Sequence, residues 1–371
     1  MKFTVKQAEL AKAVKAINRC LSRRPHLPVL GGINLVAKEG KVSLTTTDTS
    51  VGLRVSVAAE IEQEGQTVIV GKNFVETVGF LEGAKTEVTT GEKEAIVCSG
   101  RDKVKLPILT DEFPGFDDSF DADGLVKKNL DFWAKIVSDV AFVASTDQSR
   151  PALTGILLKT TGEKTQIVCT DGFRLAIWET EEKINDDDNL EVIASAKALA
   201  DLVAVAGVLG ETKVGIYHNV AAEQLVFVGE QFVFFSKLIN ASYPPFEKIV
   251  PLDFAVQAQL ERSEMLKNLA KASVFTKVDS NTVKLHLSAE QLEYNAVSLG
   301  DGSFQSSQEL VKKDGDEIEI AFNIKYLQDF LNTCEGATVW LGCNTPTTPA
   351  MLRDPGAAER KYVVMPFKPK N

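Results

Sequence analysis

The sequence predicts an α+β protein made of three tandem repeats of one domain, each combining helices with an antiparallel sheet. The main observation is a short strand followed by a helix, which occurs at residues 68–78, 192–203 and 318–331. These copies start 124 and 126 residues apart. That period is the size of a whole domain and exceeds the roughly 20–50 residues of a solenoid repeat. The 371 residues therefore form three related domains.

Two shorter markers repeat with nearly the same period. Phe113-Pro-Gly-Phe116 returns 130 residues later as Tyr243-Pro-Pro-Phe246. A Thr-Asp pair after an apolar run, at Asp48, returns at Asp171. We expect the domains to occupy residues 1–120, 121–250 and 251–371.

The first copy opens with a strand at residues 2–5 and an amphipathic helix predicted over residues 6–24. Apolar residues recur there at helical spacing, and basic residues fall almost opposite them. The apolar stripe is Leu10, Val14, Ile17 and Leu21, and the basic stripe is Lys12, Lys15, Arg19 and Arg23. Six basic residues and one acid give residues 6–24 a local charge of +5.

The later copies follow the same plan. Helices are expected at residues 132–142 and 264–273. In the latter, Met265 and Leu269 share one face, and Lys267 and Lys271 point away from it. Between the helices, short runs of β-branched residues with turns between them predict antiparallel hairpins. These runs lie at residues 33–36, 42–45, 53–57, 156–159, 166–169, 283–287 and 338–341.

Composition predicts a soluble protein of a reducing cytoplasm. Five scattered cysteines with no close pair argue against a disulfide framework. The N-terminus lacks the apolar core of a signal peptide, and no stretch is long and apolar enough to span a membrane. The net charge of −10 argues against a nucleic-acid partner unless the positive residues are segregated.

The sequence also lacks the motifs of catalysis and metal binding. Its three histidines have no ligand-like spacing, and it has no Cys-x-x-Cys pair, phosphate-binding loop, dinucleotide fingerprint or nucleophile elbow. Asp48 and Asp171 are each expected to form a turn by accepting hydrogen bonds from nearby amides. We therefore expect no enzyme, cofactor or metal. A hydrolase built around Asp171 and Arg174, and a monomeric β-rich scaffold, remain as alternatives.

Four segments in order carry a resemblance to a known family. They are Arg24-Pro-His-Leu-Pro-Val-Leu30, Thr170-Asp-Gly-Phe-Arg-Leu175, Ser236-Lys-Leu-Ile-Asn-Ala-Ser-Tyr-Pro244 and Tyr362-Val-Val-Met-Pro-Phe367. Over its full length the chain resembles the bacterial sliding clamp, the beta subunit of the DNA polymerase III holoenzyme. The resemblance implies the DNA clamp fold and a head-to-tail homodimer. Its six domains would close a ring around double-stranded DNA, with the helices lining the hole.

This resemblance implies a processivity factor of DNA replication rather than an enzyme. Contacts to phosphates carry no sequence information, so a basic ring would hold duplex DNA without sequence specificity and slide along it. Arg24 matches a DNA contact at the rim of the hole, and Gln148 and Arg150 lie in a DNA-contacting loop that here lacks paired tyrosines. The predicted DNA-binding set is Lys12, Lys15, Arg19, Arg23, Arg24, Lys72, Gln148, Arg150, Lys197, Lys267 and Lys271.

The family also has a groove between its second and third domains that accepts short peptide motifs. Its partners are the replicative polymerase alpha subunit, the clamp loader, other polymerases and repair proteins. The matching residues here are Leu153, Thr170, Gly172, Arg174, Leu175, Pro244, Lys248, Ile249, Thr347, Pro349, Val363, Val364, Met365 and Pro366. Because strand neighbours alternate faces, Val363 with Met365 or Val364 with Pro366 would meet the peptide. The resemblance also implies a kink in the backbone at the Met-Pro step, which would let both pairs contribute. The chain departs from the family in having Phe173 where histidine often stands, Lys248 in place of arginine, and an extended tail at residues 368–371.

At the subunit boundary, Val104 on one side and Val274 with Phe275 on the other match the family's apolar contact. The resemblance further implies a bacterial cytoplasmic protein that associates with the nucleoid during replication.

Overall fold

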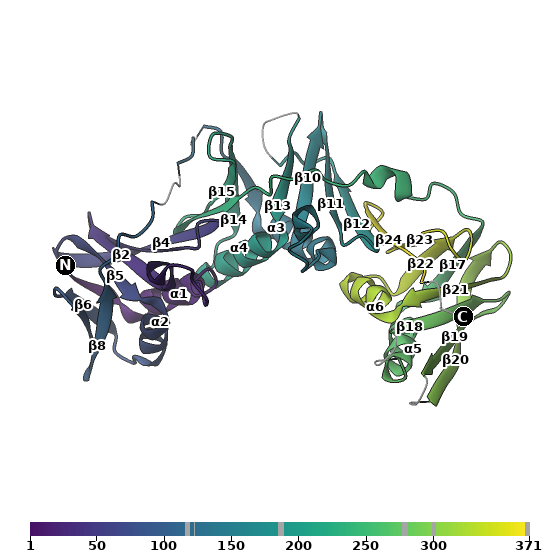
Figure 1. Ribbon diagram of the computed structural model, residues 1–371, viewed down its shortest axis with the longest axis horizontal. Coiled ribbons are helices and arrows are strands. Elements are labelled where there is room, and N and C mark those ends of the chain that lie inside the picture. Colours follow the sequence, from purple (N-terminus) through teal and green to yellow (C-terminus); the bar gives the residue numbers. More distant parts are fainter. Residues whose placement is uncertain (116–118, 122, 185–188, 277–280, 299–301, 368–371) are drawn as a thin grey trace. The chain divides into compact units, whose positions relative to one another are not determined.

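The computed structural model describes residues 1–115, 119–121, 123–184, 189–276, 281–298 and 302–367 (Figure 1). Phe116 of the repeated marker and the tail at residues 368–371 lie outside this set. The chain forms two compact units. The first is Met1–Ala134 with Ile184–Asp187 and Ala194–Ile239, and the second is Lys135–Lys183 with Asp188–Ile193 and Asn240–Asn371.

The first sheet has twelve strands among the described residues. In chain order these are β1 (Lys2–Lys6), β2 (Gly32–Lys38), β3 (Lys41–Thr47), β4 (Val51–Gln63), β5 (Gly65–Val70), β6 (Lys85–Thr90), β7 (Glu94–Ser99), β8 (Asp102–Leu109), β9 (Val126–Asn129), β14 (Lys213–Asn219), β15 (Gln224–Val228) and β16 (Phe232–Lys237). Neighbours follow the order β1-β6-β7-β8-β5-β2-β3-β4-β16-β15-β14-β9. Because β1 also pairs with β4, the strands of the first repeat close on themselves.

The helices of the first unit pack together on this sheet. They are α1 (Gln7–Ile17), α2 (Gly71–Phe80), α4 (Ala196–Leu209) and the start of α3 (Leu130–Asp139), and α1 packs against both α2 and α4 (Figure 1). Leu10, Val14 and Ile17 are at most 2% exposed. Their burial stabilises the fold by about 1.5–3 kcal/mol each. The amide of Ala198 donates to Ser195 Oγ, which caps α4, and Gly210 ends it with a φ of +79° that suits glycine.

The first helix is shorter than the sequence predicts. It ends at Ile17, and the next amides donate three residues back, from Arg19 to Ala16 and from Cys20 to Ile17. This bonding pattern tightens the last turn and stops the helix. Arg19 and Arg23 therefore lie on the following loop, and the basic helical stripe is correct only for Lys12 and Lys15.

The second sheet also has twelve strands among the described residues. They are β10 (Gly155–Thr161), β11 (Lys164–Thr170), β12 (Arg174–Thr180), β13 (Glu191–Ser195), β17 (Val256–Glu261), β18 (Thr282–Leu287), β19 (Gln291–Ser298), β20 (Gly302–Asp314), β21 (Ile318–Asn323), β22 (Thr338–Cys343), β23 (Ala350–Arg353) and β24 (Arg360–Val364). Their order is β13-β10-β11-β12-β24-β23-β22-β17-β20-β19-β18-β21. The remaining helices are α5 (Arg262–Val274) and α6 (Ile324–Thr333), with 3₁₀ turns η1 (Pro28–Gly31), η2 (Ala141–Val143), η3 (Pro151–Thr154) and η4 (Phe246–Ile249).

The structure confirms the predicted repeat. The three strand-helix copies are β5-α2, β13-α4 and β21-α6. In the first two repeats, the strand that follows the Thr-Asp turn, β4 or β12, pairs with the last strand of the next repeat, β16 or β24. Each of these two junctions is antiparallel and contains five residue pairs. The sheets therefore run across the repeat boundaries.

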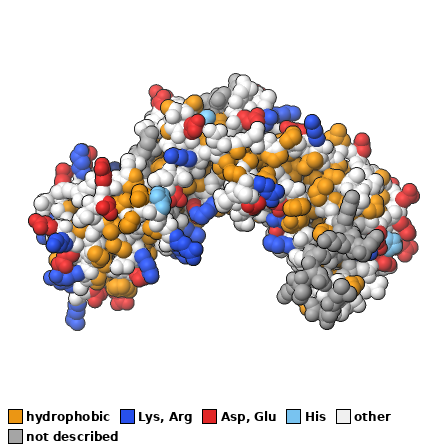
Figure 2. Space-filling model, viewed as in Figure 1, with side chains coloured by type: hydrophobic (Ala, Val, Ile, Leu, Met, Phe, Trp, Pro, Cys, Tyr) orange, Lys and Arg blue, Asp and Glu red, His pale blue; other side chains and the backbone are white. Residues whose placement is uncertain are grey.

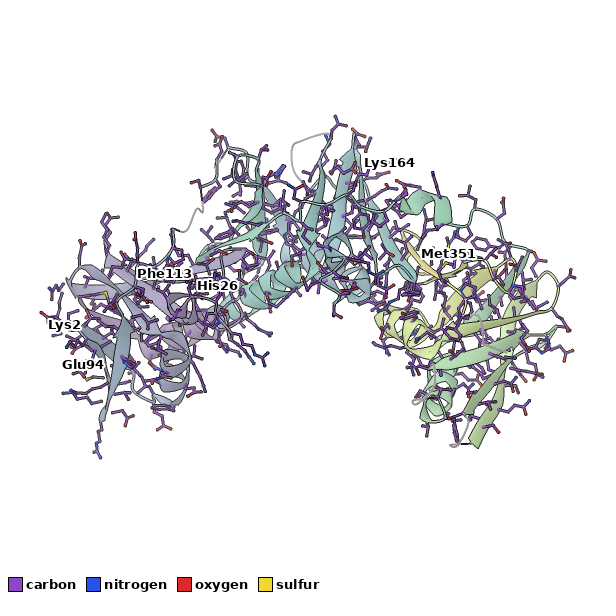
Figure 3. The ribbon with its side chains drawn as sticks, in the orientation of Figure 1. Lys2, His26, Glu94, Phe113, Lys164 and Met351 are labelled. Carbon is purple, nitrogen blue, oxygen red and sulfur yellow. The ribbon has the colours of Figure 1, made fainter. Side chains whose placement is uncertain are left out.

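The repeated aromatic-proline marker anchors the chain after the last strand of a repeat. Phe113, labelled in Figure 3, packs against the buried cluster of Val29, Leu30 and Val68. Phe246 is 5% exposed. The Tyr243 hydroxyl donates to the carbonyl of Val168 over 3.2 Å. In both copies the marker fixes the start of the linking segment to the core that precedes it.

Candidate partner groove and DNA-facing residues

A cavity of about 200 Å³ opens where β12 meets β24 in the second unit. Leu175 and Val363 face each other across the two strands and form its floor, at 0% and 1% exposure. The amide of Met365 donates to the carbonyl of Phe173 over 2.8 Å and continues the ladder beyond β24. Nine residues of the predicted groove line this cavity: Leu153, Thr170, Gly172, Arg174, Leu175, Pro244, Ile249, Val363 and Met365.

Five predicted groove residues lie outside the lining. Val364 is fully buried on the opposite side of β24, so the Val363–Met365 alternative is the one that meets the cavity. Thr347 sits in a turn held by threonine hydroxyls, in which Thr345 Oγ1 lies 3.0 Å from Thr348 Oγ1. The others outside the lining are Lys248, Pro349 and Pro366.

Three lining residues were not among those predicted: Phe173, Pro245 and Phe246. Phe173 is 56% exposed, large for an aromatic side chain. The sequence held a signal for each of them. Phe173 lies within the segment 170–175 that carries the resemblance, and the other two belong to the repeated aromatic-proline marker.

The turn at the cavity rim is built by Asp171, as the sequence predicts. Its Oδ1 accepts hydrogen bonds from the amides of Phe173 and Arg174 over 2.9 and 3.0 Å. Gly172 has a φ of +93°, which only glycine adopts readily. The equivalent Asp48 accepts from the amides of Ser50 and Val51 in the same manner. Both carboxylates are therefore turn formers, and the hydrolase alternative loses its proposed centre.

Arg174 is the main buried charge beside the cavity. Its guanidinium lies 3.0 Å from Asp171 Oδ2 and 2.7 Å from Asp329 Oδ2, and it stacks 4.5 Å from the ring centroid of Tyr326. Burial alone would lower the pKa of Arg174, but Tyr362, Asp329 and Asp171 outweigh that effect and raise it. The guanidinium therefore stays charged.

All eleven predicted DNA-binding residues are exposed. Figure 2 shows Lys and Arg side chains gathered beside α1 and α4. Several have acidic neighbours on the same helix, such as Lys72 with Glu76 and Lys197 with Asp201. Arg150 instead lies next to Gly172 of the cavity lining. A Cβ added to Gly172 would lie 3.3 Å from Arg150 Nη1. That arginine therefore stands at the rim of the groove.

The three predicted dimer residues lie in strand β8 and at the C-terminal end of helix α5. Val104 belongs to β8, whose residues Asp102–Pro107 pair only with β7 among the described residues. Phe275 follows α5 and stacks on Phe304 of β20, with ring centroids 6.1 Å apart. Val274 beside it is 59% exposed.

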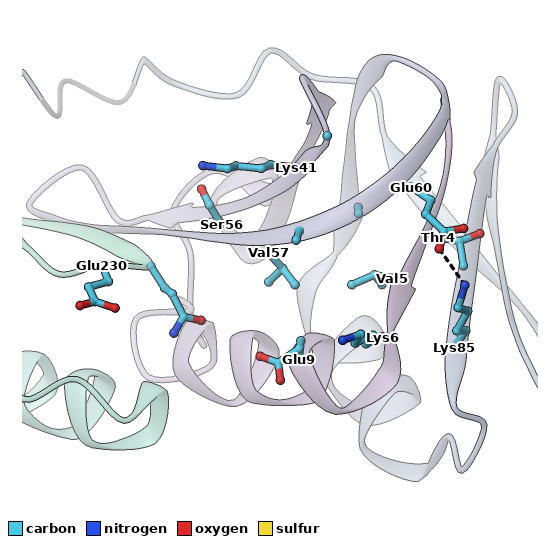
Figure 4. Close-up of a pocket in the computed structure, with 14 residues that line it drawn as sticks. Thr4, Val5, Lys6, Glu9, Lys41, Ser56, Val57, Glu60, Lys85 and Glu230 are labelled. Carbon is cyan, nitrogen blue, oxygen red and sulfur yellow. Dashed lines mark hydrogen bonds and ion pairs between the residues drawn. The ribbon is translucent and has the colours of Figure 1, made fainter.

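A second cavity, of about 660 Å³, lies in the first unit between α1, β1, β3 and β4 (Figure 4). Three lysines and three glutamates line it: Lys6, Lys41, Lys85, Glu9, Glu60 and Glu230. Lys85 is already paired with Glu60 over 2.7 Å. The balanced charge gives this cavity no attraction for an anionic ligand. Within the described ranges no group of acidic, His or Cys side chains is arranged to hold a metal, and no helix is long and apolar enough to cross a membrane.

Comparison with known proteins agrees with this architecture. Models of the N-terminal, central and C-terminal domains of the DNA polymerase III beta subunit match residues 1–117, 128–245 and 247–368. The beta sliding clamp of Streptomyces coelicolor is 29% identical, and the alignment covers 99% of each chain. That of Bacillus subtilis is 26% identical, over 99% of this chain and 100% of the relative.

Solved structures give the same result. The crystal structure of the sliding clamp from Bacillus subtilis has a TM-score of 0.89 at 25% identity, and covers 100% of both chains. The DNA polymerase III beta subunit from Thermotoga maritima shares the fold, with a TM-score of 0.92 at 22% identity over 100% of both chains.

Three tandem clamp domains joined by shared sheets define a sliding clamp, a non-catalytic processivity factor. The chain belongs to the DNA polymerase III beta subunit family.

Proposed function

We propose that two copies of this chain close head to tail into a ring of six domains around duplex DNA, and that the groove at β12 and β24 tethers replication and repair proteins by short peptide motifs. The domain boundaries would lie near residues 120 and 250. The ring would work in the bacterial cytoplasm, on the nucleoid during replication. Its partners would be the polymerase alpha subunit, the clamp loader, other polymerases and repair proteins.

Exposed basic residues support the DNA contact. All eleven predicted residues are accessible, and residues 6–24 carry a local charge of +5 in a chain of net charge −10. Lysine and arginine attract phosphates without reading bases, and the attraction weakens as salt rises. Such contacts hold a ring on DNA without fixing its position, so topology would keep it bound.

The internal repeat carries the argument for ring closure. Each junction within the chain joins the strand after a turn in one repeat to the last strand of the next repeat. In the third repeat the strand equivalent to β4 and β12 is β20. In the first repeat the last strand, equivalent to β16 and β24, is β8. Among the described residues, Gly302–Glu309 of β20 pairs only with β19, and Asp102–Pro107 of β8 only with β7. An open edge invites pairing with another chain, and these two complete the series between copies.

The residues that line the groove favour a peptide partner with apolar side chains. Its floor is aliphatic, and exposed Phe173, Ile249 and Met365 line it above that floor. Apolar side chains would enter by desolvation, and a methionine adapts its shape to more than one ligand. Partners with the pattern Gln-Leu-x-Leu-Phe would fit this chemistry.

The test is topological. The protein is loaded onto nicked circular DNA by the clamp loader of the same organism and separated from free protein by gel filtration. We expect it to stay on the circle at moderate salt and to be lost once a restriction enzyme linearises the DNA. Equal retention on circular and linear DNA would indicate ordinary surface binding and overturn the ring.

A further inference from the structure

The floor of the groove is a seam between two repeats. β12 belongs to the middle repeat and β24 to the third, and five residue pairs from Arg174–Val364 to Trp178–Arg360 join them. Leu175 and Val363 face the cavity. The shape of the groove therefore depends on how closely and in which register these strands meet.

Two arginines cross this seam in opposite directions. Arg174, on β12, reaches Asp329 on α6 of the third repeat, with 2.7 Å between Nη1 and Oδ2. Arg360, on β24, reaches Asp139 at the end of α3 in the middle repeat, with 3.6 Å between Nη1 and Oδ1. Each repeat thus supplies one arginine and accepts the other.

The exchange is enclosed and well bonded. The two arginine side chains are 7% and 5% exposed, and those of Asp329 and Asp139 are 21% and 11% exposed. Arg360 also donates to the carbonyl and hydroxyl of Thr333 over 3.0 and 2.7 Å. In each pair the two charges come from different repeats, so a change in how the repeats meet would separate them, although Arg174 also pairs with Asp171 inside the middle repeat.

An aromatic stack lies between the two arginines. Tyr362 of β24 stacks on Phe142 of η2 and on Phe330 of α6, with centroid distances of 5.8 and 4.8 Å. Its hydroxyl donates to the carbonyl of Tyr326 over 2.9 Å. Tyr362 neighbours Val363 in the chain, so the stack lies directly behind the groove floor.

We propose that this reciprocal exchange, Arg174 with Asp329 and Arg360 with Asp139, sets the strand register at the groove, and that the two aspartates are positioning residues for partner binding. Neither aspartate lines the cavity. The proposal rests on the peptide-binding function proposed above. A slip of one residue would turn Leu175 or Val363 away from the cavity and separate the buried charges. Buried ion pairs often contribute little net stability. In this protein they would select one register against others, because a slip leaves buried charges without their partners.

The experiment compares Asp329→Asn and Asp139→Asn with the wild type and with Lys325→Gln. Lys325 pairs with the same Asp329, at 2.7 and 2.8 Å, but is 63% exposed, so its removal leaves the seam intact. Binding of a labelled Gln-Leu-Ala-Leu-Phe peptide is followed by fluorescence polarisation. We expect both aspartate variants to bind about 2- to 30-fold more weakly and Lys325→Gln to match the wild type.

A second readout needs no ligand. Hydrogen exchange at the amides of Tyr362, Val363 and Val364 should accelerate in the two aspartate variants and stay unchanged in Lys325→Gln. If Asp139→Asn does not fold, Arg360→Lys replaces it, because lysine keeps the charge but loses the forked geometry.

The outcomes separate the two proposals. A wild type that does not bind the peptide overturns the groove function, while accelerated exchange in the variants would still support the seam. Wild-type affinity and exchange in both aspartate variants overturn the positioning role. Weaker binding with unchanged exchange also overturns it, because the effect would then not come from the seam.

Discussion

A substitution at Ile249 tests the groove directly. Its side chain is 42% exposed and lines the cavity, so a charge there leaves the folded core intact. A peptide that covers this position would have to desolvate the new carboxylate. We expect Ile249→Asp to weaken binding of the labelled Gln-Leu-Ala-Leu-Phe peptide by about tenfold or more, or roughly 1.4 kcal/mol.

The matched control for that variant is Leu252→Asp. Leu252 is 87% exposed, lies three positions further along the chain and does not line the cavity. It should retain wild-type affinity in the same fluorescence polarisation assay. Equal losses in the two variants would mean that general surface charge, and not the groove, governs binding.

Asp354 makes one part of the fold sensitive to acid. Burial would raise the pKa of its carboxyl, but hydrogen bonds from the amides of Gly356, Gly336 and Glu335, and the nearby Arg360, outweigh burial and lower it. A folded-state pKa below the unfolded value of about 3.9 stabilises the protein above that pH. This contribution is lost as the pH falls through the folded-state pKa.

We therefore expect Asp354→Asn to lower stability at pH 7 by about 1–3 kcal/mol, since the asparagine loses charge-assisted hydrogen bonds. The difference from the wild type should shrink as the pH falls below about 4, because the wild-type carboxyl then takes up its proton. Thermal unfolding followed by fluorescence at both pH values measures this. A constant difference between pH 7 and pH 3 would contradict the assignment.

Single residues also show where sequence reasoning ends. The sequence predicts most of the residues that line the groove, but it does not predict which of their side chains are buried and which are exposed. Leu175 and Val363 are buried floor, whereas Phe173 and Ile249 are exposed. Apolar residues at the end of a strand look alike in a sequence, and their exposure is decided by the partner strand. Here that partner, β24, lies nearly two hundred residues further along the chain.

At the scale of elements, α1 and the loop after it carry the basic segment. Lys12, Lys15 and Arg19 are exposed, and Lys12 forms only a long ion pair with Glu9, over 3.9 Å. Changing all three residues to Glu reverses the local charge without touching the buried Leu10, Val14 and Ile17. We expect shorter retention on nicked circular DNA at low and moderate salt, and the difference from the wild type should shrink as salt rises, because salt weakens the phosphate contacts that the wild type makes.

The control for the charge reversal changes three exposed lysines at strand ends, Lys38, Lys41 and Lys164, to Glu. This variant has the same net charge and should be retained like the wild type. If both triple variants lose retention equally, total charge and not the α1 segment is responsible.

Most elements are visible in the sequence because their periodicity is local, but their ends are not. The predicted helix over residues 6–24 stops at Ile17 although Leu21 continues the apolar spacing. In the structure Leu21 instead packs against Gly71, since a Cβ added there would lie 2.6 Å from Leu21 Cδ1. A tertiary contact in a turn can repeat the spacing of a helix, and no local pattern separates the two.

At the scale of the whole molecule, the proposed assembly of two copies can be tested at Phe275. It stacks on Phe304 at the open edge of β20, beside the exposed Val274. If Phe275 meets Val104 of a second copy as proposed, Phe275→Arg would place an unpaired charge in that apolar contact, which costs several kcal/mol. We expect a folded monomer by size-exclusion chromatography with light scattering. A variant still dimeric at nanomolar concentration would contradict the assignment.

Val220→Arg is the matched control for the assembly test. Val220 is 72% exposed and lies between β14 and β15, away from β8 and β20 along the chain. The same charge introduced there should leave the dimer unchanged, which separates the effect of the edge from that of an added arginine.

The three repeats can be found by spacing alone, but the two compact units cannot. The middle repeat contributes β14 to β16 to one sheet and β10 to β12 to the other. This division follows from the pairs β4–β16 and β12–β24, which join strands far apart in the sequence. Strand pairing over such separations depends on side-chain fit between strands, which periodicity within a single strand does not encode.

The uniform junctions between repeats give the proposed ring a direction. Since every junction uses the same two strand positions in the same order, the ring repeats by rotation about one axis. Such a rotation does not interchange the two faces of the ring, so the two faces present different surfaces. Both grooves of a dimer then open toward the same face. Two proteins held at once would approach the DNA from the same side of the ring. One could then replace the other on the DNA while the ring stays in place.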